Sequence, residues 1–599
     1  MFASLVLVFS ILPQSSTPPV AYWKTREDRY QDGQIFAIKG PNLMVSGFPK
    51  SESVGGETGL RLAGEADGLI YPWDSRREWP QMPKRDFTVS IWFSSDSYRG
   101  TQGVIGCIFQ PREGLTGWRL ILKDGKPEFT LANLGTQKSL SAPSSLSASK
   151  LQRLDASYDG EKIRLYVGGV LKATEDAKFG EITYNGRAGI CLGDWWEGPR
   201  SLHFDGFYSR AALFDKALTP AQVDQGLAAV SEPPMPDGEG SEQKMAIAPY
   251  FQYPTTDAVT VMWKTSRTSS SVVRYGESIA KTKTVSGKPG RIHEVGLSGL
   301  KPATTYFVQT ESSVGGKALL SEWASFRTGS MPGTPVKFAV VGDTQDHPEA
   351  NKEVAAAMFA ERPDFAMIVG DLVGMGWMMN QWEHDFFGSM RPLFSHVPLI
   401  PVLGNHERNA RIYYDLMSVP APEFYYTYTT GDVQVWVIDT EHDISPGSAQ
   451  YRWLDRTLGE SKAKWKVTAH HYPPYSSDLD DYGDSREGPI EGGDLRVRQL
   501  SALYDKHSVD LCFSGHIHSY ERTHPLRGGK VAEDGKGTIY LVVGGGGGDL
   551  EQFAPTRQTF SHTVRTGHHF GIVSADPRKL EFKAYDSQGR LFDSFSLVK

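Results

Sequence analysis

The chain has 599 residues, of which 39% are hydrophobic, and its 63 basic and 70 acidic residues give a formal net charge of −7. This length exceeds one ordinary hydrophobic core, so we expect roughly two to four domains. The charges are spread along the chain without a basic stripe that could neutralise nucleic-acid phosphates, which argues against nucleic acid as the main partner.

The chain begins with an apolar run over residues 2–12, followed by a stretch over 13–18 that contains Pro, Ser and Thr. The run is too short to span a bilayer, and the pattern is typical of a signal peptide with its cleavage zone. A basic segment before the run is missing, because Lys24 is the first Lys or Arg. We predict a signal peptide over residues 1–21 and a secreted, periplasmic or cell-surface location; the alternative is a frayed or mis-started N terminus. No later segment has the length and apolarity of a membrane span.

The chain contains three cysteines, Cys107, Cys191 and Cys512, each in an apolar, strand-like context. So few cysteines exclude a scaffold built on disulfides. We predict free thiols, with a bridge between Cys107 and Cys191 as the alternative.

Residues 22–230 alternate short strands with glycine-rich turns, for example at 87–93 and 163–170, which favours a β-sandwich. The stretches 156–160, 165–169, 204–206 and 213–219 resemble laminin-G-like, concanavalin-A-like jelly-roll domains. This resemblance implies a glycan or surface partner. Trp195 and Trp196 could form an aromatic platform for a sugar, although packing against the sandwich or the next domain is the favoured interpretation.

Residues 231–244 are rich in Pro, Gly and acidic residues and are predicted to be a linker. A compact series of strands follows over 245–330. The corner at 300–306 and the strand tryptophan Trp263 resemble a fibronectin-III-like sandwich, specifically the N-terminal module of plant-type purple acid phosphatases.

Residues 331–599 alternate strands with helical stretches, the clearest helices being expected over 351–361, 450–458 and 495–507. Alternation of this kind predicts an α/β domain of stacked sheets. Five of its apolar strands end in groups that bind metals, namely Asp343, Asp371, Asn405, His471 and the pair His516 and His518. Ligand-binding groups of α/β sheets lie just past the carboxyl ends of strands, so a sheet could gather these side chains.

Mixed carboxylate, amide and imidazole donors suit iron, zinc or manganese better than calcium. Six donors suit two metal ions that share one carboxylate, for which we choose Asp371. Solvent bound by the metals would lose a proton and attack the phosphorus of a phosphate ester. His406 would then hydrogen-bond a phosphate oxygen or protonate the leaving oxygen.

The segments 342–343, 370–371, 404–407, 471–477 and 515–522 resemble the calcineurin-like metallophosphoesterases, most of all the purple acid phosphatases. The resemblance covers roughly the last 270 residues of the chain. It implies that Asp343, Asp371 and His518 hold one metal, and that the other is held by Asp371, Asn405, His471 and His516. His470 competes with His471 for one position, and the His-x-Pro-Pro spacing favours His471.

Two positions depart from these families. Purple acid phosphatases carry a tyrosine three residues after the shared aspartate, where this chain has Gly374, so a phenolate ligand to ferric iron is not expected. Gln345 stands where many relatives in the wider superfamily place a histidine ligand. The side-chain oxygen of Gln345 either binds the first metal directly or lies just outside the ligands of that metal.

The sequence thus predicts a multidomain chain with two all-β sandwiches, over 22–230 and 245–330, followed by an α/β metallophosphoesterase sandwich over 331–599. The predicted function is that of a dinuclear, acid phosphatase-like enzyme that hydrolyses phosphomonoesters by a metal-bound hydroxide. The alternatives are a phosphodiesterase of the same fold and a glycan- or surface-binding protein with an inactive phosphatase scaffold.

Overall fold

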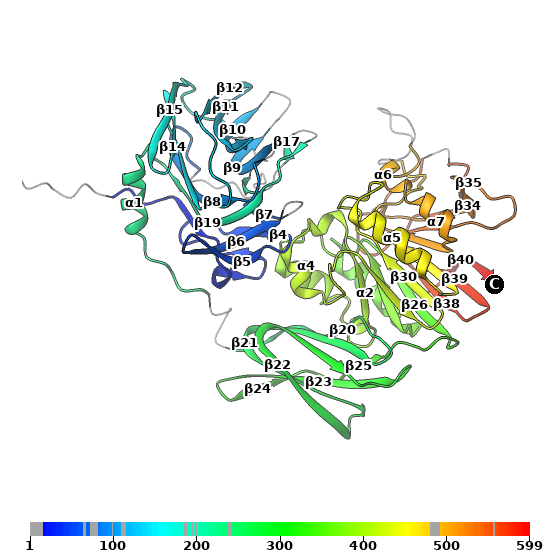
Figure 1. Cartoon of the computed structure of the whole chain (residues 1–599). Helices are drawn as coiled ribbons and strands as arrows, with labels where there is room; N and C mark the ends of the chain where they lie inside the picture. Colours follow the sequence, from blue (N-terminus) through cyan, green and yellow to red (C-terminus); the bar gives the residue numbers. More distant parts are fainter. Residues whose placement is uncertain are drawn as a thin grey trace, which may run out of the picture. The chain divides into compact units, whose positions relative to one another are not determined.

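The computed structural model describes residues 16–63, 67–71, 82–98, 100–109, 115–184, 189–193, 196–197, 200–236, 242–479, 491–554 and 557–599. The chain divides into two compact units, one up to Met235 and one from Pro236 onward (Figure 1). Most of the predicted signal peptide, Trp195 and the side chain of Trp196 lie outside the described residues. Within the described part, no helix has the length and apolarity needed to cross a membrane.

The first unit consists mainly of two antiparallel sheets. One has the order β15-β14-β13-β8-β19-β6-β5 with β1 beside β19, and the other has the order β12-β11-β10-β9-β16-β7-β4-β3-β2. The strands are β1 (Ala21–Lys24), β2 (Tyr30–Gln31), β3 (Gln34–Ile35), β4 (Leu43–Ser46), β5 (Lys50–Val54), β6 (Glu57–Ala63), β7 (Gly68–Tyr71), β8 (Asp86–Ser95), β9 (Thr101–Phe109), β10 (Thr116–Lys123), β11 (Lys126–Asn133), β12 (Thr136–Ser141), β13 (Gln152–Asp159), β14 (Lys162–Val167), β15 (Val170–Asp176), β16 (Ile190–Leu192), β17 (Trp196–Glu197), β18 (Arg200–Ser201) and β19 (Asp205–Phe214).

The two sheets pack face to face through alternate side chains of their strands. Phe87 of β8 lies with its ring centroid 6.0 Å from that of Trp118 in β10 and 6.5 Å from that of Phe129 in β11. All three rings are fully or almost fully buried in one core. The β-sandwich prediction for this segment is therefore confirmed. The 3-10 turn η1 (Glu27–Arg29) and the helix α1 (Pro220–Ala228) complete the unit.

The cysteines are free thiols. Cys191 pairs with Gly106, the neighbour of Cys107, and adjacent residues of a strand point to opposite faces. Cys107 accordingly lies in the core between the sheets, whereas Cys191 packs against Ile121 and Leu202. The structure decides for free thiols over a Cys107–Cys191 bridge.

The second unit contains a twelve-stranded and a seven-stranded sheet. The first has the order β24-β23-β21-β20-β28-β27-β26-β38-β39-β40, with β22 beside β21 and β25 beside β23, and the second has the order β29-β30-β31-β32-β36-β33-β37. The strands are β20 (Met245–Gln252), β21 (Ala258–Ser278), β22 (Lys281–Ser298), β23 (Thr305–Val314), β24 (Lys317–Leu320), β25 (Ala324–Arg327), β26 (Val336–Val341), β27 (Phe365–Val369), β28 (Leu399–Val402), β29 (Tyr426–Thr430), β30 (Val433–Val437), β31 (Trp465–Ala469), β32 (Leu511–Ser514), β33 (Tyr520–Thr523), β34 (Leu526–Arg527), β35 (Lys530–Val531), β36 (Ile539–Val543), β37 (Ser561–Arg565), β38 (His569–Ala575), β39 (Lys579–Asp586) and β40 (Leu591–Val598).

The two sheets of this unit stack with helices on their outer faces. In β26, Phe338 and Val340 point into the core between the sheets, and Ala339 and Val341 pack under the helices. This period of two is the one expected of a strand covered on both faces. The helices are α2 (Pro348–Ala360), η2 (Gln381–Phe386), α3 (Arg391–Phe394), η3 (Asn405–Glu407), α4 (Arg411–Leu416), α5 (Ala449–Glu460), α6 (Leu495–Arg498) and α7 (Ser501–His507). The stretch 495–507, predicted as one helix, thus forms two.

The strands of the middle segment, β20 to β25, have a core of their own around Trp263, Tyr306 and Phe326. They nevertheless continue the sheet of the α/β segment, because β20 pairs with β28 in parallel through Gln252 and Leu399. The buried Lys264 also forms an ion pair of 2.6 Å with Glu383 of η2. The sequence did not predict this continuous sheet, because a single parallel pair of residues leaves no periodic pattern in the sequence.

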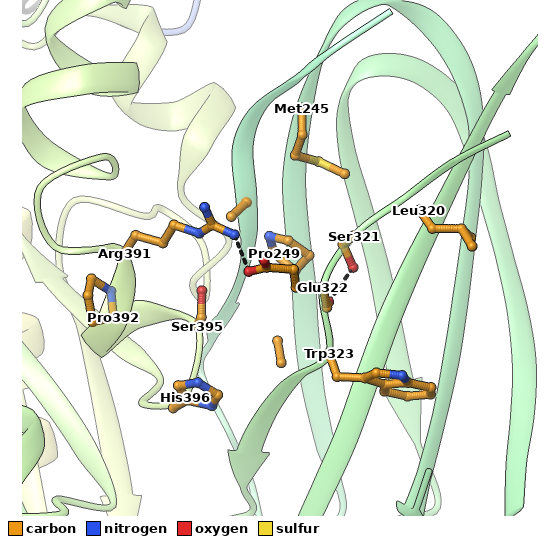
Figure 2. Close-up of a pocket in the computed structure, with 12 residues that line it drawn as sticks. Met245, Pro249, Leu320, Ser321, Glu322, Trp323, Arg391, Pro392, Ser395 and His396 are labelled. Atoms are coloured by element: carbon orange, nitrogen blue, oxygen red, sulfur yellow. Dashed lines mark hydrogen bonds and ion pairs between the residues drawn. The ribbon is translucent and has the colours of Figure 1, made fainter. Parts of the chain in front are cut away.

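A pocket of about 460 Å³ lies between the middle segment and α3 (Figure 2). Trp323 and Pro249 line it on one side, and Arg391, which forms an ion pair of 2.6 Å with Glu322, lines it on the other. None of the predicted metal ligands is among its lining residues.

Candidate metal centre

The strand-end donors lie at the carboxyl ends of parallel strands from both sheets. Asp343 and Asp371 follow β26 and β27, and Asn405 follows β28 within η3. His471 follows β31, and His516 and His518 follow β32 in the facing sheet. Because both sheets present these ends to the same place, residues far apart in the sequence meet there.

Three of these residues have strained backbones. The φ angles of Asp343, Asp371 and His516 are 60°, 50° and 70°, in the left-handed region that non-glycine residues rarely adopt. Each such residue costs about 1–2 kcal/mol. Strain of this kind persists where the surrounding structure enforces it and concentrates at functional sites.

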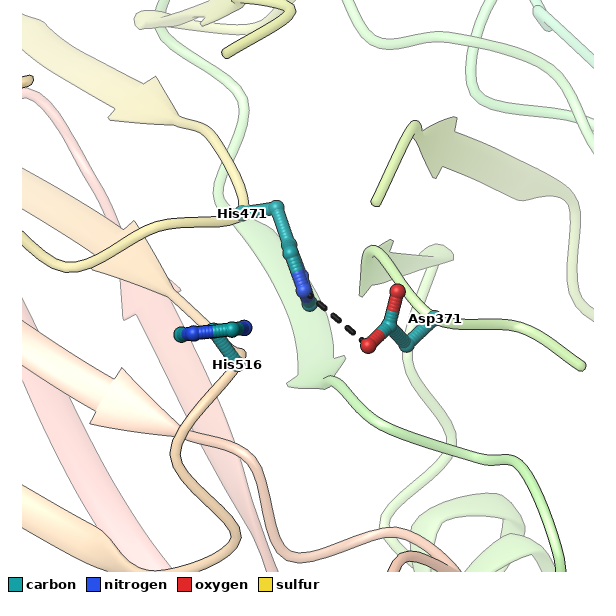
Figure 3. Close-up of side chains that lie close together, drawn as sticks. All are labelled: Asp371, His471 and His516. Atoms are coloured by element: carbon teal, nitrogen blue, oxygen red, sulfur yellow. Dashed lines mark ion pairs between the residues drawn. The ribbon is translucent and has the colours of Figure 1, made fainter. Parts of the chain in front are cut away.

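Asp371, His471 and His516 form a tight cluster together with Asn405. The possible ligand atoms of the first three all lie within 4.8 Å of one another (Figure 3). Nε2 of His471 lies 3.1 Å from Oδ2 of Asp371 and 3.0 Å from Oδ1 of Asn405. Nδ1 of His516 lies 3.1 Å from the same Asn405 oxygen. Four donors of the types preferred by transition metals therefore converge on one point.

The orientation of His471 is set by its other nitrogen. Nδ1 of its ring lies 3.0 Å from the carbonyl oxygen of Val369 and donates to it, so Nε2 is directed at Asp371. Burial by itself lowers the pKa of His471, but the Asp371 carboxylate outweighs this effect and raises the pKa to about 10. Burial likewise favours a higher pKa for Asp371, whereas His471 holds it below its ordinary value. The metal-free pair is therefore an ion pair of imidazolium and carboxylate, and a metal cation would replace the proton on Nε2 of His471.

Asp343, His518 and Gln345 form a second group beside the first. Nε2 of His518 lies 3.6 Å from Oδ1 of Asp343 and 3.1 Å from Nε2 of Gln345. Nδ1 of His518 donates to the carbonyl oxygen of Asp549 at 2.6 Å, which leaves Nε2 as the ligand atom. Oε1 of Gln345 is buried and has no hydrogen-bond partner among the described residues. An orphaned buried oxygen beside a carboxylate and an imidazole fits a metal ligand.

Close-packed glycines surround both groups. A Cβ atom at Gly404 would lie 2.3 Å from Oδ1 of Asp371, and one at Gly515 would lie 2.4 Å from Oδ2 of Asp343. A side chain at either position would displace a carboxylate. Glycine is therefore required for the backbone to approach the donors this closely.

His406 lies at the edge of the cluster, half exposed. Its backbone N–H donates to Oδ1 of Asp371 at 2.8 Å, and its Nδ1 donates to the carbonyl oxygen of Gly374 at 2.9 Å. Nε2 lies 4.0 Å from Oδ2 of Asp371 and faces the site. A neutral His406 would thus present a lone pair, and only the imidazolium could donate a proton from Nε2.

The structure shows where the competing His470 lies and why Gly374, rather than a tyrosine, stands at its position. His470 is fully buried and its Nε2 lies 3.2 Å from Sγ of Cys512, so it lies behind the cluster. A Cβ at Gly374 would lie 2.5 Å from Oδ1 of Asp346. The position that a tyrosine side chain would need is therefore occupied by the Asp346 carboxylate.

Sequence reasoning missed two residues that contact the cluster. Glu407 is a fully buried carboxylate that accepts the backbone N–H of Asp371 at 3.0 Å. The ring of Tyr472 packs on that of His516 with centroids 4.3 Å apart. The sequence carried a weak signal for both, because each directly follows a predicted site residue, His406 or His471.

Two stacked sheets with metal-binding side chains at their carboxyl ends define the class of calcineurin-like phosphoesterases. The family model with that description matches residues 336–520. The model for the purple acid phosphatase N-terminal domain matches 246–328, and that for the concanavalin A-like lectin/glucanase superfamily matches 75–224.

Comparison with individual proteins narrows the class. The chain is 30% identical over 336 residues to probable purple acid phosphatase 20 of Arabidopsis thaliana, in an alignment that covers 50% of this chain and 73% of that protein. The chain therefore belongs to the purple acid phosphatase family. The fold also resembles that of purple acid phosphatase PPD1 from yellow lupin seeds, with a TM-score of 0.54 and 19% identity over 90% of this chain and 93% of that one.

Another relative is named as inactive. The chain is 27% identical over 363 residues to probable inactive purple acid phosphatase 27 of Arabidopsis thaliana, covering 52% of this chain. This chain spans 58% of the length of that relative.

Proposed function

We propose that this chain is a dinuclear, metal-dependent phosphohydrolase that acts on phosphomonoesters. The observation that carries the proposal is the convergence of Asp371, His471 and His516, whose ligand atoms lie within 4.8 Å of one another. Asp343 and His518, 3.6 Å apart, stand beside this cluster as a second ligand group. Two adjacent groups of donors suit two metals better than one.

In this proposal Asp371 is the carboxylate shared by both metals. The first metal would be held by Asp343, Asp371, His518 and Gln345, and the second by Asp371, Asn405, His471 and His516. The donor set suits iron, zinc or manganese. When bound, two such ions lower the pKa of solvent and stabilise negative charge on a phosphoryl group.

His406 is proposed to act on the substrate. Because its Nδ1 is held by the Gly374 carbonyl at 2.9 Å, Nε2 is the free nitrogen toward the site. The imidazolium form would donate to a phosphate oxygen or protonate the leaving oxygen.

The test compares the native protein with Asp371→Asn. We expect the native protein to contain two metal equivalents and to hydrolyse p-nitrophenyl phosphate, and the variant to lose metal and about 100-fold or more in kcat/KM, since removing one key stabilising group costs this much. Gln450→Asn, a buried change in α5, serves as a matched control for folding. A native protein without metal and without turnover would end the enzyme proposal.

Two alternatives have distinct outcomes in the same experiment. A phosphodiesterase would prefer bis(p-nitrophenyl) phosphate over the monoester. A binding protein with an inactive scaffold would hydrolyse neither ester. This alternative is considered because one relative is named as inactive. The donor set favours catalysis, because a scaffold that no longer catalyses a reaction does not need to keep every metal ligand.

The remaining sequence predictions enter as proposals. We propose that domains span 22–230, 245–330 and 331–599 with a linker at 231–244, and that the middle domain is fibronectin-III-like. We also propose export through a signal peptide at 1–21, which sequencing the N terminus of the mature protein would test. A glycan partner has no support in the described residues and awaits a glycan-binding assay.

A further inference from the structure

Glu407 carries a buried carboxyl group that the proposed mechanism does not use. Its side chain is fully buried, and it directly follows His406 in η3. Asp371, also buried, lies beside it and contacts it through its backbone N–H. A second buried carboxyl group beside Asp371 adds a desolvation cost and, when ionised, a like charge, so it must make strong compensating contacts.

Those contacts are backbone N–H groups from two loops. Oε1 of Glu407 accepts from Leu372 at 2.7 Å and from Val373 at 3.4 Å. Oε2 accepts from Asp371 at 3.0 Å and from Gly404 at 2.7 Å. Three donors thus belong to the loop after β27, and the fourth belongs to the loop after β28.

The two loops carry the ligands that must meet at one metal. Asp371 itself provides one of the N–H groups, and it holds a left-handed φ of 50°. Gly404, which provides another, directly precedes Asn405 and leaves no room for a Cβ beside Asp371. A single carboxylate therefore fixes both the strained turn at Asp371 and its separation from Asn405.

We infer that Glu407 is a positioning residue: by accepting N–H groups from both loops, it holds Asp371 and Asn405 where they can share a metal. This inference rests on the proposed dinuclear function. Glu407 would not touch metal or substrate, and its effect would reach the centre through the backbone. Groups that orient metal ligands in this way typically contribute 10- to 100-fold to metal affinity.

The test measures metal affinity by competition with a chromophoric chelator, without reference to turnover. In Glu407→Gln an amide NH2 replaces one acceptor and faces N–H donors, so we expect a 10- to 100-fold loss of affinity for Mn²⁺ or Zn²⁺. Glu407→Asp keeps both acceptor oxygens on a shorter side chain and should recover part of the loss. The dimanganese form would supply a spectroscopic signature, because exchange coupling in its electron paramagnetic resonance spectrum would appear only when two manganese ions are bound close together.

The matched control is Asp510→Asn. Asp510 is also largely buried and accepts a backbone N–H, from Lys466 at 2.8 Å, but it joins the amino ends of β31 and β32, away from the ligand loops at their carboxyl ends. We expect this variant to bind metal as the wild type does.

Four results would overturn the inference. Wild-type affinity in Glu407→Gln would overturn it, and so would an equal loss in Asp510→Asn, which would mark the effect as general destabilisation. If Glu407→Gln does not fold, wild-type affinity and coupling in Glu407→Asp would decide against it. A wild-type protein that binds no metal would instead overturn the proposed function and this inference together.

Discussion

At the scale of single residues, the metal centre depends on the ionisation of His471. Its pKa of about 10 means that the metal-free protein holds a proton on Nε2 at neutral pH, in contact with Asp371. A metal ion binds neutral imidazole and must displace this proton. The proton and the metal therefore compete for one position.

We accordingly expect metal affinity to rise with pH up to about pH 10. Between pH 6 and pH 8, each metal bound at this position should release about one proton from His471. Isothermal titration calorimetry in two buffers of different ionisation enthalpy measures the released protons. Uptake without proton release would contradict the arrangement of His471 and Asp371.

At the scale of elements, the loop that carries His516 and His518 is fastened by the last strand. Arg522 of β33 donates to both carboxylate oxygens of Asp593 in β40, at 2.6 and 2.9 Å, and Tyr520 donates to one of them at 2.6 Å. Charge-assisted, bidentate pairs of this kind are the strong ones. Strand β40 thus holds the strand that follows the histidine loop.

Asp593→Asn should destabilise the second unit by about 1–3 kcal/mol, less than for a fully buried ion pair because Asp593 is partly solvated. Burial favours a higher pKa for Asp593, but hydrogen bonds from Arg522 and Tyr520 bring the pKa below its ordinary value. A carboxyl with a lowered folded-state pKa stabilises the protein above its unfolded-state pKa of about 3.9, and this contribution disappears as pH falls through the folded-state pKa.

Urea unfolding at pH 7 and at pH 3 measures this difference. The gap between variant and wild type should be present at pH 7 and should shrink as the pH falls below about 4. Asp534→Asn, at a pair of exposed side chains 3.3 Å apart, is the control and should change stability by less than about 0.5 kcal/mol. An equal gap at both pH values would show that Asp593 acts through packing alone.

At the scale of the whole molecule, the metal-free second unit buries three carboxylates at one place. Burial raises the pKa of Asp343 and of Glu407 well above their ordinary values, and in each case Asp371 adds to the effect. Metal cations would relieve this repulsion. A ligand that binds only the folded state at 100 times its Kd adds about 2.7 kcal/mol of stability.

Removal of metal should therefore lower the Tm of the second unit and leave that of the first unchanged, because the cores of the two units share no residues. Differential scanning calorimetry with and without a chelator checks this, and the transition of the first unit is the internal control. A shift of both transitions, or of neither, would contradict the assignment of the metals.

The strand-end blocks were recognisable in the sequence because each is local. An apolar run followed by Gly-Asp, Gly-Asn-His-Glu or Gly-His-Ile-His carries both the strand and its donor within a few residues. The β-sandwich of the first unit was predictable for the same reason, since alternation and turns are short-range patterns.

Contacts between distant segments were decided only by the tertiary structure. The parallel pair of Gln252 and Leu399, the Asp346 carboxylate at the place of a tyrosine, and the four N–H groups around Glu407 each join residues by through-space proximity. The orphaned oxygen of Gln345 and the tautomers of His406 and His471 likewise depend on which carbonyl lies nearby. The sequence by itself determined which groups could bind metal, and folding determined how two sheets bring them together, because the packing of distant strands leaves no local pattern.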